Sequence, residues 1–158
     1  MERLQLIESF TKSRDAILEQ FDTADADLAK AYAPGKWTVR ELLVHLADCE
    51  FIYLWRVGRG LAEPGSRVEG FDQDAWAREL NYVSRPLPIC RELFEAARNQ
   101  LIYFLEAHED GALERQFNHS EAGMLTIRKG LSGFARHSEH HLEQINAARE
   151  GREWKPQE

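Results

Sequence analysis

The sequence has few cysteines and no long hydrophobic run, and each shortage excludes a class of protein. Its two cysteines, Cys49 and Cys90, are too few for a disulfide framework, which favours a reducing compartment. No apolar run approaches the roughly 18 residues that a membrane-spanning helix needs. Residues 1–4 also lack the basic and apolar blocks of a signal peptide. We therefore expect a cytoplasmic protein with no membrane segment.

An excess of positive charge is also missing. The 27 Asp and Glu residues outnumber the 20 Lys and Arg residues, and the net charge of −7 is spread along the chain. No surface is then basic enough to neutralise a phosphate backbone, so nucleic acid is not an expected partner. The 158 residues, 43% of them hydrophobic, predict one domain over 1–158, with a frayed tail over 151–158.

Glycine and proline gather at a few places, and between them apolar residues recur every three or four positions. This spacing indicates an all-α protein with four long helices, over 4–31, 38–61, 88–108 and 126–150. The stretch 66–85, in which Asp72 caps a short helix, is long enough to let the second and third helices run parallel. Residues 116–124 form an irregular segment or a small hairpin. The sequence thus predicts a four-helix bundle with a long crossover between helices two and three.

The start of the second helix is the best-specified local feature. Thr38 and Glu41 match the Ser/Thr-x-x-Glu capping box, in which each side chain binds the backbone N–H of the other residue. Trp37 and Leu42 occupy the flanking hydrophobic positions. We expect the helix to begin here.

Three of the six histidines lie on or beside the predicted core faces. On the last helix His137 and His141 are one turn apart at the edge of the buried stripe, whereas His140 lies off it. A His pair at this spacing can chelate one divalent ion, and the inward His45 is the natural third ligand. Such a pair also arises by chance, and three core histidines with separate hydrogen-bond partners are the alternative.

Several motifs make the family recognisable. Residues 35–41 (GKWTVRE), 45–48 (HLAD), 71–76 (FDQDAW), 117–119 (FNH) and 137–142 (HxxHHL) resemble the DinB/YfiT-like superfamily in order along nearly the whole chain. The resemblance is closest to the YfiT-like branch, described as metal-dependent hydrolases and including bacillithiol S-transferases. It implies a four-helix bundle, a homodimer, and nickel or zinc bound by His45, His137 and His141.

Other side chains are candidates for the site around these histidines. Asp48 follows His45 by three residues and is a candidate general base or imidazole partner, whereas the capping box already uses Glu41. Arg56 is a candidate contact for an anionic substrate, and His119 is either a substrate contact or a solvated loop residue. Cys49 is either a further metal ligand or a small buried hydrophobe.

Two function classes follow from these residues. The first is a metal-dependent enzyme that activates water or a low-molecular-weight thiol, and so acts on a small molecule as a hydrolase or thiol S-transferase. The second is a non-catalytic dimeric metal- or ligand-binding protein, which a fourth protein ligand such as Cys49 or His119 would favour.

The second helix also carries apolar residues away from its inward stripe. Phe51, Leu54 and Trp55 lie on this outer side and predict a contact between two identical chains, unless the crossover covers them.

Overall fold

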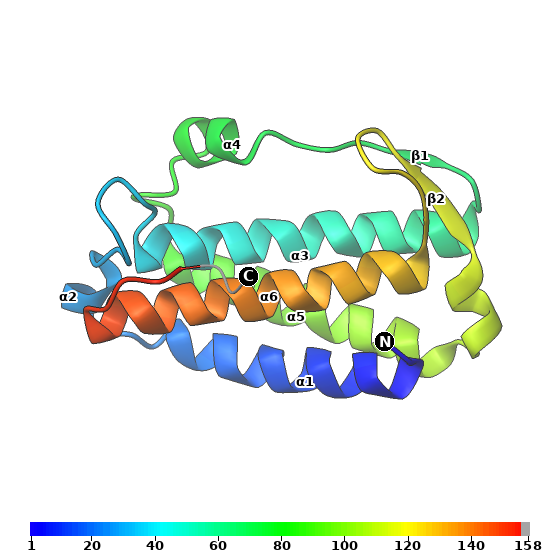
Figure 1. The fold of residues 1–158 in the computed structure, drawn as a ribbon, viewed down its shortest axis with the longest axis horizontal. Coiled ribbons are helices and arrows are strands. Elements are labelled where there is room, and N and C mark those ends of the chain that lie inside the picture. Colours follow the sequence, from blue (N-terminus) through cyan, green and yellow to red (C-terminus); the bar gives the residue numbers. More distant parts are fainter. Residues whose placement is uncertain (156–158) are drawn as a thin grey trace.

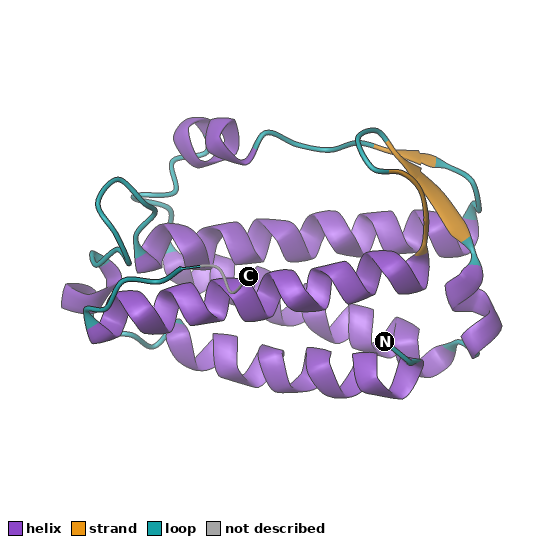
Figure 2. Cartoon of the chain, in the orientation of Figure 1, coloured by secondary structure: helices purple, strands orange, loops and turns teal. Residues whose placement is uncertain are grey.

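The computed structural model describes residues 1–155, and most of them lie in four long helices packed side by side (Figures 1 and 2). These are α1 (Arg3–Gln20), α3 (Val39–Ala62), α5 (Leu87–Ala107) and α6 (Ile127–Glu150). In Figure 1, α1 and α6 run in one direction and α3 and α5 in the other. The predicted helical bundle is confirmed, with corrections to two of its parts. Within the described residues no helix is both long and apolar enough to cross a membrane.

The first helix is shorter than its periodicity predicts. It ends at Gln20, and a separate short helix, α2 (Asp25–Leu28), follows. Phe21 and Leu28 are buried as a single helix would require, so the apolar spacing continues across the break. After Gln20 the backbone N–H groups of Phe21, Asp22 and Thr23 donate to carbonyl groups three residues earlier, so the helix ends in tightened turns.

The second correction is a small sheet of three strands. β2 (Gln116–His119) and β3 (Gly123–Thr126) form the antiparallel hairpin that was one of two expectations for this segment. β1 (Arg67–Val68), from the connection between α3 and α5, adds to β2 in parallel, and no sequence pattern predicted it. The sheet closes one end of the bundle over α3, where Phe117 packs against Gly60 and Gly130.

The connection between α3 and α5 runs along the outside of the bundle and carries α4 (Gln73–Glu79) (Figure 1). Asp72 caps α4 as predicted, because its Oδ1 accepts hydrogen bonds from the backbone of Asp74 and Ala75. At the other end of α3 the Thr38–Glu41 capping box is also confirmed, since the Glu41 carboxylate accepts from the Thr38 N–H at 2.8 Å. These caps fix where the helices beside the site begin.

A buried ion pair lies at the centre of the bundle. Arg98 of α5 and Glu50 of α3 are fully buried and hydrogen-bonded to each other. The same guanidinium donates to Ser13 of α1 at 2.6 Å and to Ser138 of α6 at 2.9 Å. The Arg98 side chain therefore joins all four long helices, and its partner Ser138 directly follows His137 in the sequence.

The chain beyond α6 folds back onto the bundle in the part that the structure describes. The Trp154 ring lies 4.4 Å from the His140 ring and 5.7 Å from the Tyr32 ring, between centroids. The indole N–H donates to the Glu143 carboxylate. The remainder of the predicted frayed tail, residues 156–158, lies outside the described residues.

Candidate metal centre

The three histidines singled out in the sequence meet between α3 and α6. The Nε2 atom of His137 lies 3.2 Å from Nε2 of His45 and 3.1 Å from Nε2 of His141. One ring nitrogen from each of the three lies within 4.8 Å of the others, and no other His, Cys, Asp or Glu of residues 1–155 joins the group. Adjacent turns of α6 supply two imidazoles and the facing turn of α3 supplies the third.

Burial keeps these imidazoles neutral. Removal from water is the main cause that lowers the pKa of His45 to about 3, of His137 to about 2 and of His141 to about 4, and for the first two the other histidines of the cluster act in the same direction. Neutral imidazole is the form that binds a metal ion.

Hydrogen bonding among the three rings cannot satisfy the cluster. A neutral imidazole Nε2 carries either one hydrogen or one lone pair, yet the His137 Nε2 faces two other nitrogens at hydrogen-bond distance. The Nδ1 atom of His137 is also buried without a partner.

The spacing suits a shared cation instead. An ion with metal–nitrogen bonds of about 2.0–2.1 Å holds neighbouring ligand nitrogens roughly 3.0–3.4 Å apart. Both short distances in the cluster fall in this range. The residues present therefore fit a divalent transition-metal ion.

Gln144 sets the orientation of His141. Its Oε1 lies 2.8 Å from the His141 Nδ1, and its amide nitrogen faces the Tyr32 hydroxyl at 3.3 Å and the His140 Nε2 at 3.0 Å. The amide nitrogen can only donate, so Oε1 accepts from the Nδ1–H of His141. This tautomer places the His141 lone pair on Nε2, toward the cluster. The sequence reasoning missed Gln144, although its place one turn after His141 was the available signal.

Cys49 lies beside the cluster without being one of its members. Its Sγ is 3.4 Å from the His45 Nε2 and 4.0 Å from the His137 Nε2. Burial raises the pKa of the thiol, and the neighbouring Glu50 and Asp48 carboxylates raise it further. The side chain is a neutral buried thiol here, in agreement with the small-hydrophobe alternative.

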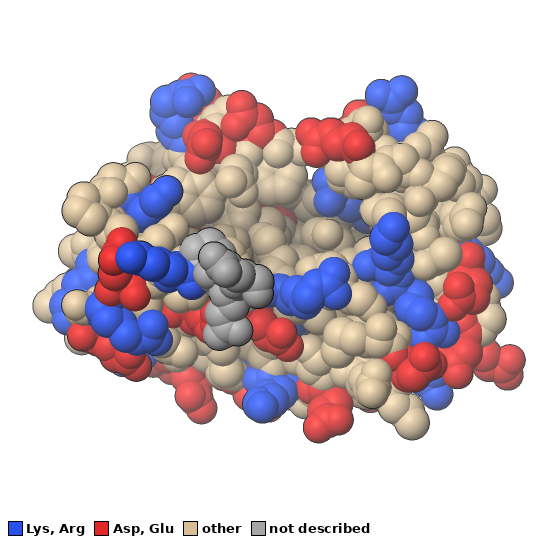
Figure 3. Space-filling model, viewed as in Figure 1, with Lys and Arg blue, Asp and Glu red and all other residues tan. Residues whose placement is uncertain are grey.

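The cluster is reached through two cavities of about 400 Å³ and 410 Å³ that share Gln73, His140 and His141. Two aromatic rings lie near the His45 ring. The distance between ring centroids is 5.0 Å for Trp37 and 6.4 Å for Phe71. Figure 3 shows a hollow on this face, between the part of the surface formed by α4 and the part formed by the sheet. The site is thus partly covered but accessible.

Asp48 is engaged with the crossover. Its Oδ2 accepts from the Tyr82 hydroxyl at 2.7 Å and its Oδ1 from Arg85 at 2.6 Å. Within the described residues no hydrogen bond joins Asp48 to the three histidines. The contacts of Asp48 therefore favour a role in holding the crossover against α3, and they do not favour a role as an imidazole partner or a general base.

The two candidate substrate residues lie together at the sheet end of the site. Arg56 is buried on α3 and donates to the backbone oxygen of Glu69, just after β1. His119 ends β2, and its Nδ1 accepts from the backbone N–H of Glu121 and of Ala122. Burial lowers the pKa of His119, and the nearby positive charge of Arg56 lowers it further.

Comparison with known sequences identifies the relatives of this chain. A family model described as the DinB superfamily matches residues 9–145. The "Putative metal-dependent hydrolase OB0782" of Oceanobacillus iheyensis is 29% identical over 133 residues, which are 84% of this chain and 77% of that protein. A second protein of this organism, "Putative metal-dependent hydrolase OB0413", is 26% identical over 147 residues, or 93% of this chain and 83% of that one.

Solved structures share the fold. YfiT from Bacillus subtilis, described as a probable metal-dependent hydrolase with an unusual four-helix bundle topology, superposes with a TM-score of 0.86 at 22% identity. The alignment covers 95% of this chain and 88% of YfiT. A mycothiol-dependent maleylpyruvate isomerase superposes with a TM-score of 0.73 at 12% identity, over 92% of this chain and 61% of the isomerase.

Proposed function

Because the chain belongs to the DinB superfamily, we propose that it is an enzyme that holds one divalent metal ion on His45, His137 and His141. The observation that carries the proposal is the convergence of three neutral imidazole nitrogens on one point that hydrogen bonds alone cannot satisfy. Three imidazole donors suit zinc or nickel, which we propose as the resident ion.

The chemistry is the activation of a nucleophile for attack on a small molecule. A divalent ion at this position supplies Lewis acidity, which lowers the pKa of a bound water or thiol. The relatives support both nucleophiles: OB0782 and YfiT are described as hydrolases and the isomerase as mycothiol-dependent. We propose a hydrolase or a thiol S-transferase.

The chain's own residues position the reactants. Gln144 holds His141 in one tautomer, and the rings of Trp37 and Phe71 exclude water from one side of His45. Gln73 and His140 line both cavities and are placed to orient a substrate that enters.

An open set of ligands favours the enzyme over the non-catalytic alternative. The Nδ1 atom of His119 is used inside its own hairpin, and Cys49 lies outside the group of nitrogens within 4.8 Å. Three protein ligands leave a position for water or substrate, whereas structural zinc is usually closed by four.

Metal analysis of matched histidine variants tests the proposal. We expect about one transition-metal ion per chain in the reconstituted wild type and a large loss in His141→Ala. The control is His140→Ala, which removes a neighbouring imidazole outside the cluster and is expected to keep the ion. Equal metal content in all three proteins would refute the ligand set. A panel of esters, thiols and electrophiles, assayed with the zinc and nickel forms, then separates hydrolysis from thiol transfer.

A further inference from the structure

We propose that the guanidinium of Arg56 binds a carboxylate group of the small molecule whose reacting end lies at the three histidines. The inference rests on the proposed function and adds a second recognition point to the site. It gives the substrate a chemical class: an acid with its carboxylate separated from the reacting atom by a short chain.

The side chain of Arg56 is a buried cation that lacks an acidic partner. It is 5% exposed, and no carboxylate oxygen of the described residues lies within 4.0 Å of its guanidinium nitrogens. One nitrogen donates to the Glu69 backbone oxygen, and the buried Nε has no partner. The other deeply buried arginine, Arg98, has Glu50 beside it. A buried charge normally needs such a partner, so Arg56 is poised to accept an anion.

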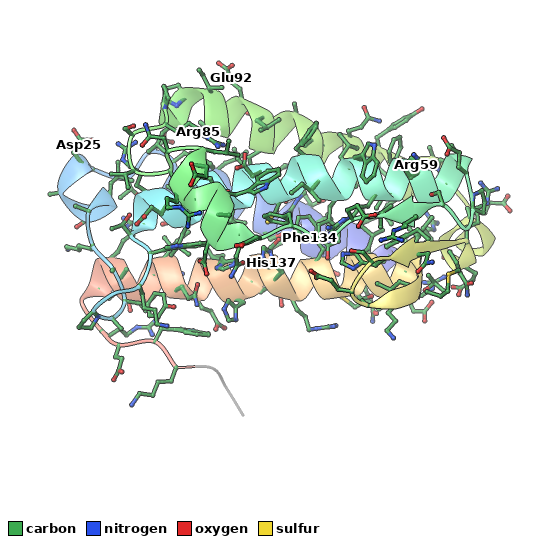
Figure 4. The ribbon with its side chains drawn as sticks, turned by 90° about the horizontal axis from the view of Figure 1, so that it is seen from above. Asp25, Arg59, Arg85, Glu92, Phe134 and His137 are labelled. Atoms are coloured by element: carbon green, nitrogen blue, oxygen red, sulfur yellow. The ribbon has the colours of Figure 1, made fainter. Side chains whose placement is uncertain are left out.

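A wall of aromatic rings connects the histidines to Arg56. The Phe134 ring lies 5.7 Å from the His137 ring and stacks on Tyr53 at 3.7 Å, and the Arg56 guanidinium lies 5.4 Å from the Tyr53 ring centroid. Figure 4 shows Phe134 and His137 in succession along the side of α6 that faces α3. Phe134 is fully buried, and Tyr53, which stacks on it, is partly exposed. A molecule lying against the Tyr53 ring would have the metal position at one end and Arg56 at the other.

The separation of His45 and Arg56 along α3 sets the distance between the two ends of the ligand. Arg56 follows His45 by eleven residues, which is about 16 Å along the helix axis, and a long side chain points back toward the helix start. The guanidinium then lies roughly 10 Å from the histidine cluster. A chain of a few methylenes between the two ends of the ligand fits this distance.

Glu121 in the β2–β3 turn is a nearby carboxylate that acts on Arg56 without forming an ion pair with it. The Glu121 carboxylate lies against Gly70, and a Cβ atom built on Gly70 would be 2.6 Å from it. Gly70 directly follows Glu69, whose backbone oxygen accepts from Arg56. Burial lowers the pKa of Arg56, and Glu121 is among the nearby groups that oppose this shift. Because Glu121 is exposed, its side chain is free to move into solvent when a carboxylate arrives.

Binding of a series of thiol acids to the cobalt(II)-loaded protein tests two features of the ligand together: the distance between its thiol and its carboxylate, and the need for the negative charge. Mercaptoacetate, mercaptopropionate, mercaptobutyrate and mercaptohexanoate are compared with mercaptoalcohols of the same lengths, and thiolate-to-cobalt absorption reports binding. We expect one or more of the longer acids to bind at least tenfold more tightly than the matched alcohol, and mercaptoacetate to show no such preference.

Three charge variants locate the effect. Arg56→Met is expected to erase the preference for acids, so that an acid and an alcohol of the same length bind with similar affinity. The control Arg59→Met removes a more exposed arginine of the same helix, already paired with Glu63, and is expected to keep the preference. Glu121→Gln, an exposed change that does not depend on refolding of the core, is expected to tighten binding of the acids only.

The outcomes separate the two proposals. Failure to bind cobalt would refute the metal site itself. Cobalt binding with equal affinity for acids and alcohols at every length would overturn the Arg56 site and leave the metal site standing. An acid preference that survives Arg56→Met, or acid binding that Glu121→Gln leaves unchanged, would also overturn it.

Discussion

At the scale of single residues, the histidine site depends on an amide that never touches the metal position. Gln144 receives the Nδ1–H of His141 and directs its own N–H groups to Tyr32 and His140. The amide thereby connects a ligand to the wall of the cavity, so the direction of the His141 lone pair depends on the side chain one turn further along α6.

Removal of this acceptor is expected to weaken metal binding. In Gln144→Leu the buried Nδ1–H of His141 loses its partner, and we expect metal affinity to fall about 10- to 100-fold. Gln144→Glu keeps an acceptor at the same place and is expected to retain most of the affinity. Competition titration with a chelator measures both. Wild-type affinity in the leucine variant would show that the amide does not orient the ligand.

The buried imidazoles also make the metal-free protein sensitive to acid. Their pKa values are lowered to about 3, 2 and 4 in the fold, whereas histidine in an unfolded chain has a pKa of about 6.5. Below about pH 6.5 the unfolded chain therefore binds more protons, and the free energy of unfolding decreases as the pH falls. Each imidazole contributes up to about 1.4 kcal/mol per pH unit in this range.

Urea unfolding of the metal-free protein between about pH 7.5 and 5.5 measures this dependence. We expect the stability of the wild type to fall steadily and that of His141→Asn to fall less, because one titrating group is gone. A flat profile for the wild type would mean that the three rings are not held neutral.

At the scale of secondary-structure elements, sequence patterns predicted what local spacing encodes and missed what depends on distant partners. The capping box at Thr38 and the cap at Asp72 are confirmed because each depends on residues within one turn. The end of α1 at Gln20 was missed because Phe21 and Leu28 continue the apolar period across a polar break. β1 could not be predicted, because two residues acquire strand geometry only by pairing with β2.

The residues of the site show the same difference between local spacing and distant partners. Helical periodicity placed His45, His137 and His141 on facing sides of two helices, and the structure brings them together. The partners of Asp48 are Tyr82 and Arg85, which lie more than thirty residues further along the chain, so no local pattern connects them.

The pairing of Asp48 predicts an effect on the crossover. In Asp48→Asn the Arg85 guanidinium loses its anionic partner, and we expect the free energy of unfolding to drop by about 2–3 kcal/mol. Tyr82→Phe removes a single neutral donor and is expected to cost about 1 kcal/mol. Urea unfolding measures both, and proteolysis within residues 63–86 reports local loosening. An Asp48→Asn protein that is as stable as the wild type but inactive would instead support the general-base hypothesis.

At the scale of the whole molecule, the outer face of α3 exposes two large apolar side chains one helical turn apart. Phe51 and Trp55 are 54% and 45% exposed, so the crossover does not cover them. Leu54, expected on the same side, instead packs partly into the core. We propose that the chain forms a homodimer through Phe51 and Trp55, since exposed apolar neighbours often mark a two-fold contact.

Sedimentation equilibrium tests this assembly. We expect a dimeric wild type, and dissociation without unfolding in the double variant Phe51→Glu, Trp55→Glu. Leu4→Glu changes an exposed leucine on α1 and is expected to leave the dimer intact. A monomeric wild type would refute the proposal. Leu54→Glu is a poor probe because its effect on the core would obscure any effect on assembly.

The position of Trp37 has an optical consequence. Its indole lies against the His45 ring, whereas Trp55 lies on the outer face of α3. Because indole emission responds to charge and to open-shell ions nearby, Trp37 is a built-in fluorophore at the histidine cluster. Nickel binding is expected to quench this emission and zinc binding to quench it much less, while Trp37→Phe is expected to remove the largest part of the response and leave the smaller part that comes from Trp76 and Trp154. Occupancy and exchange of the ion can then be followed in real time with no added dye.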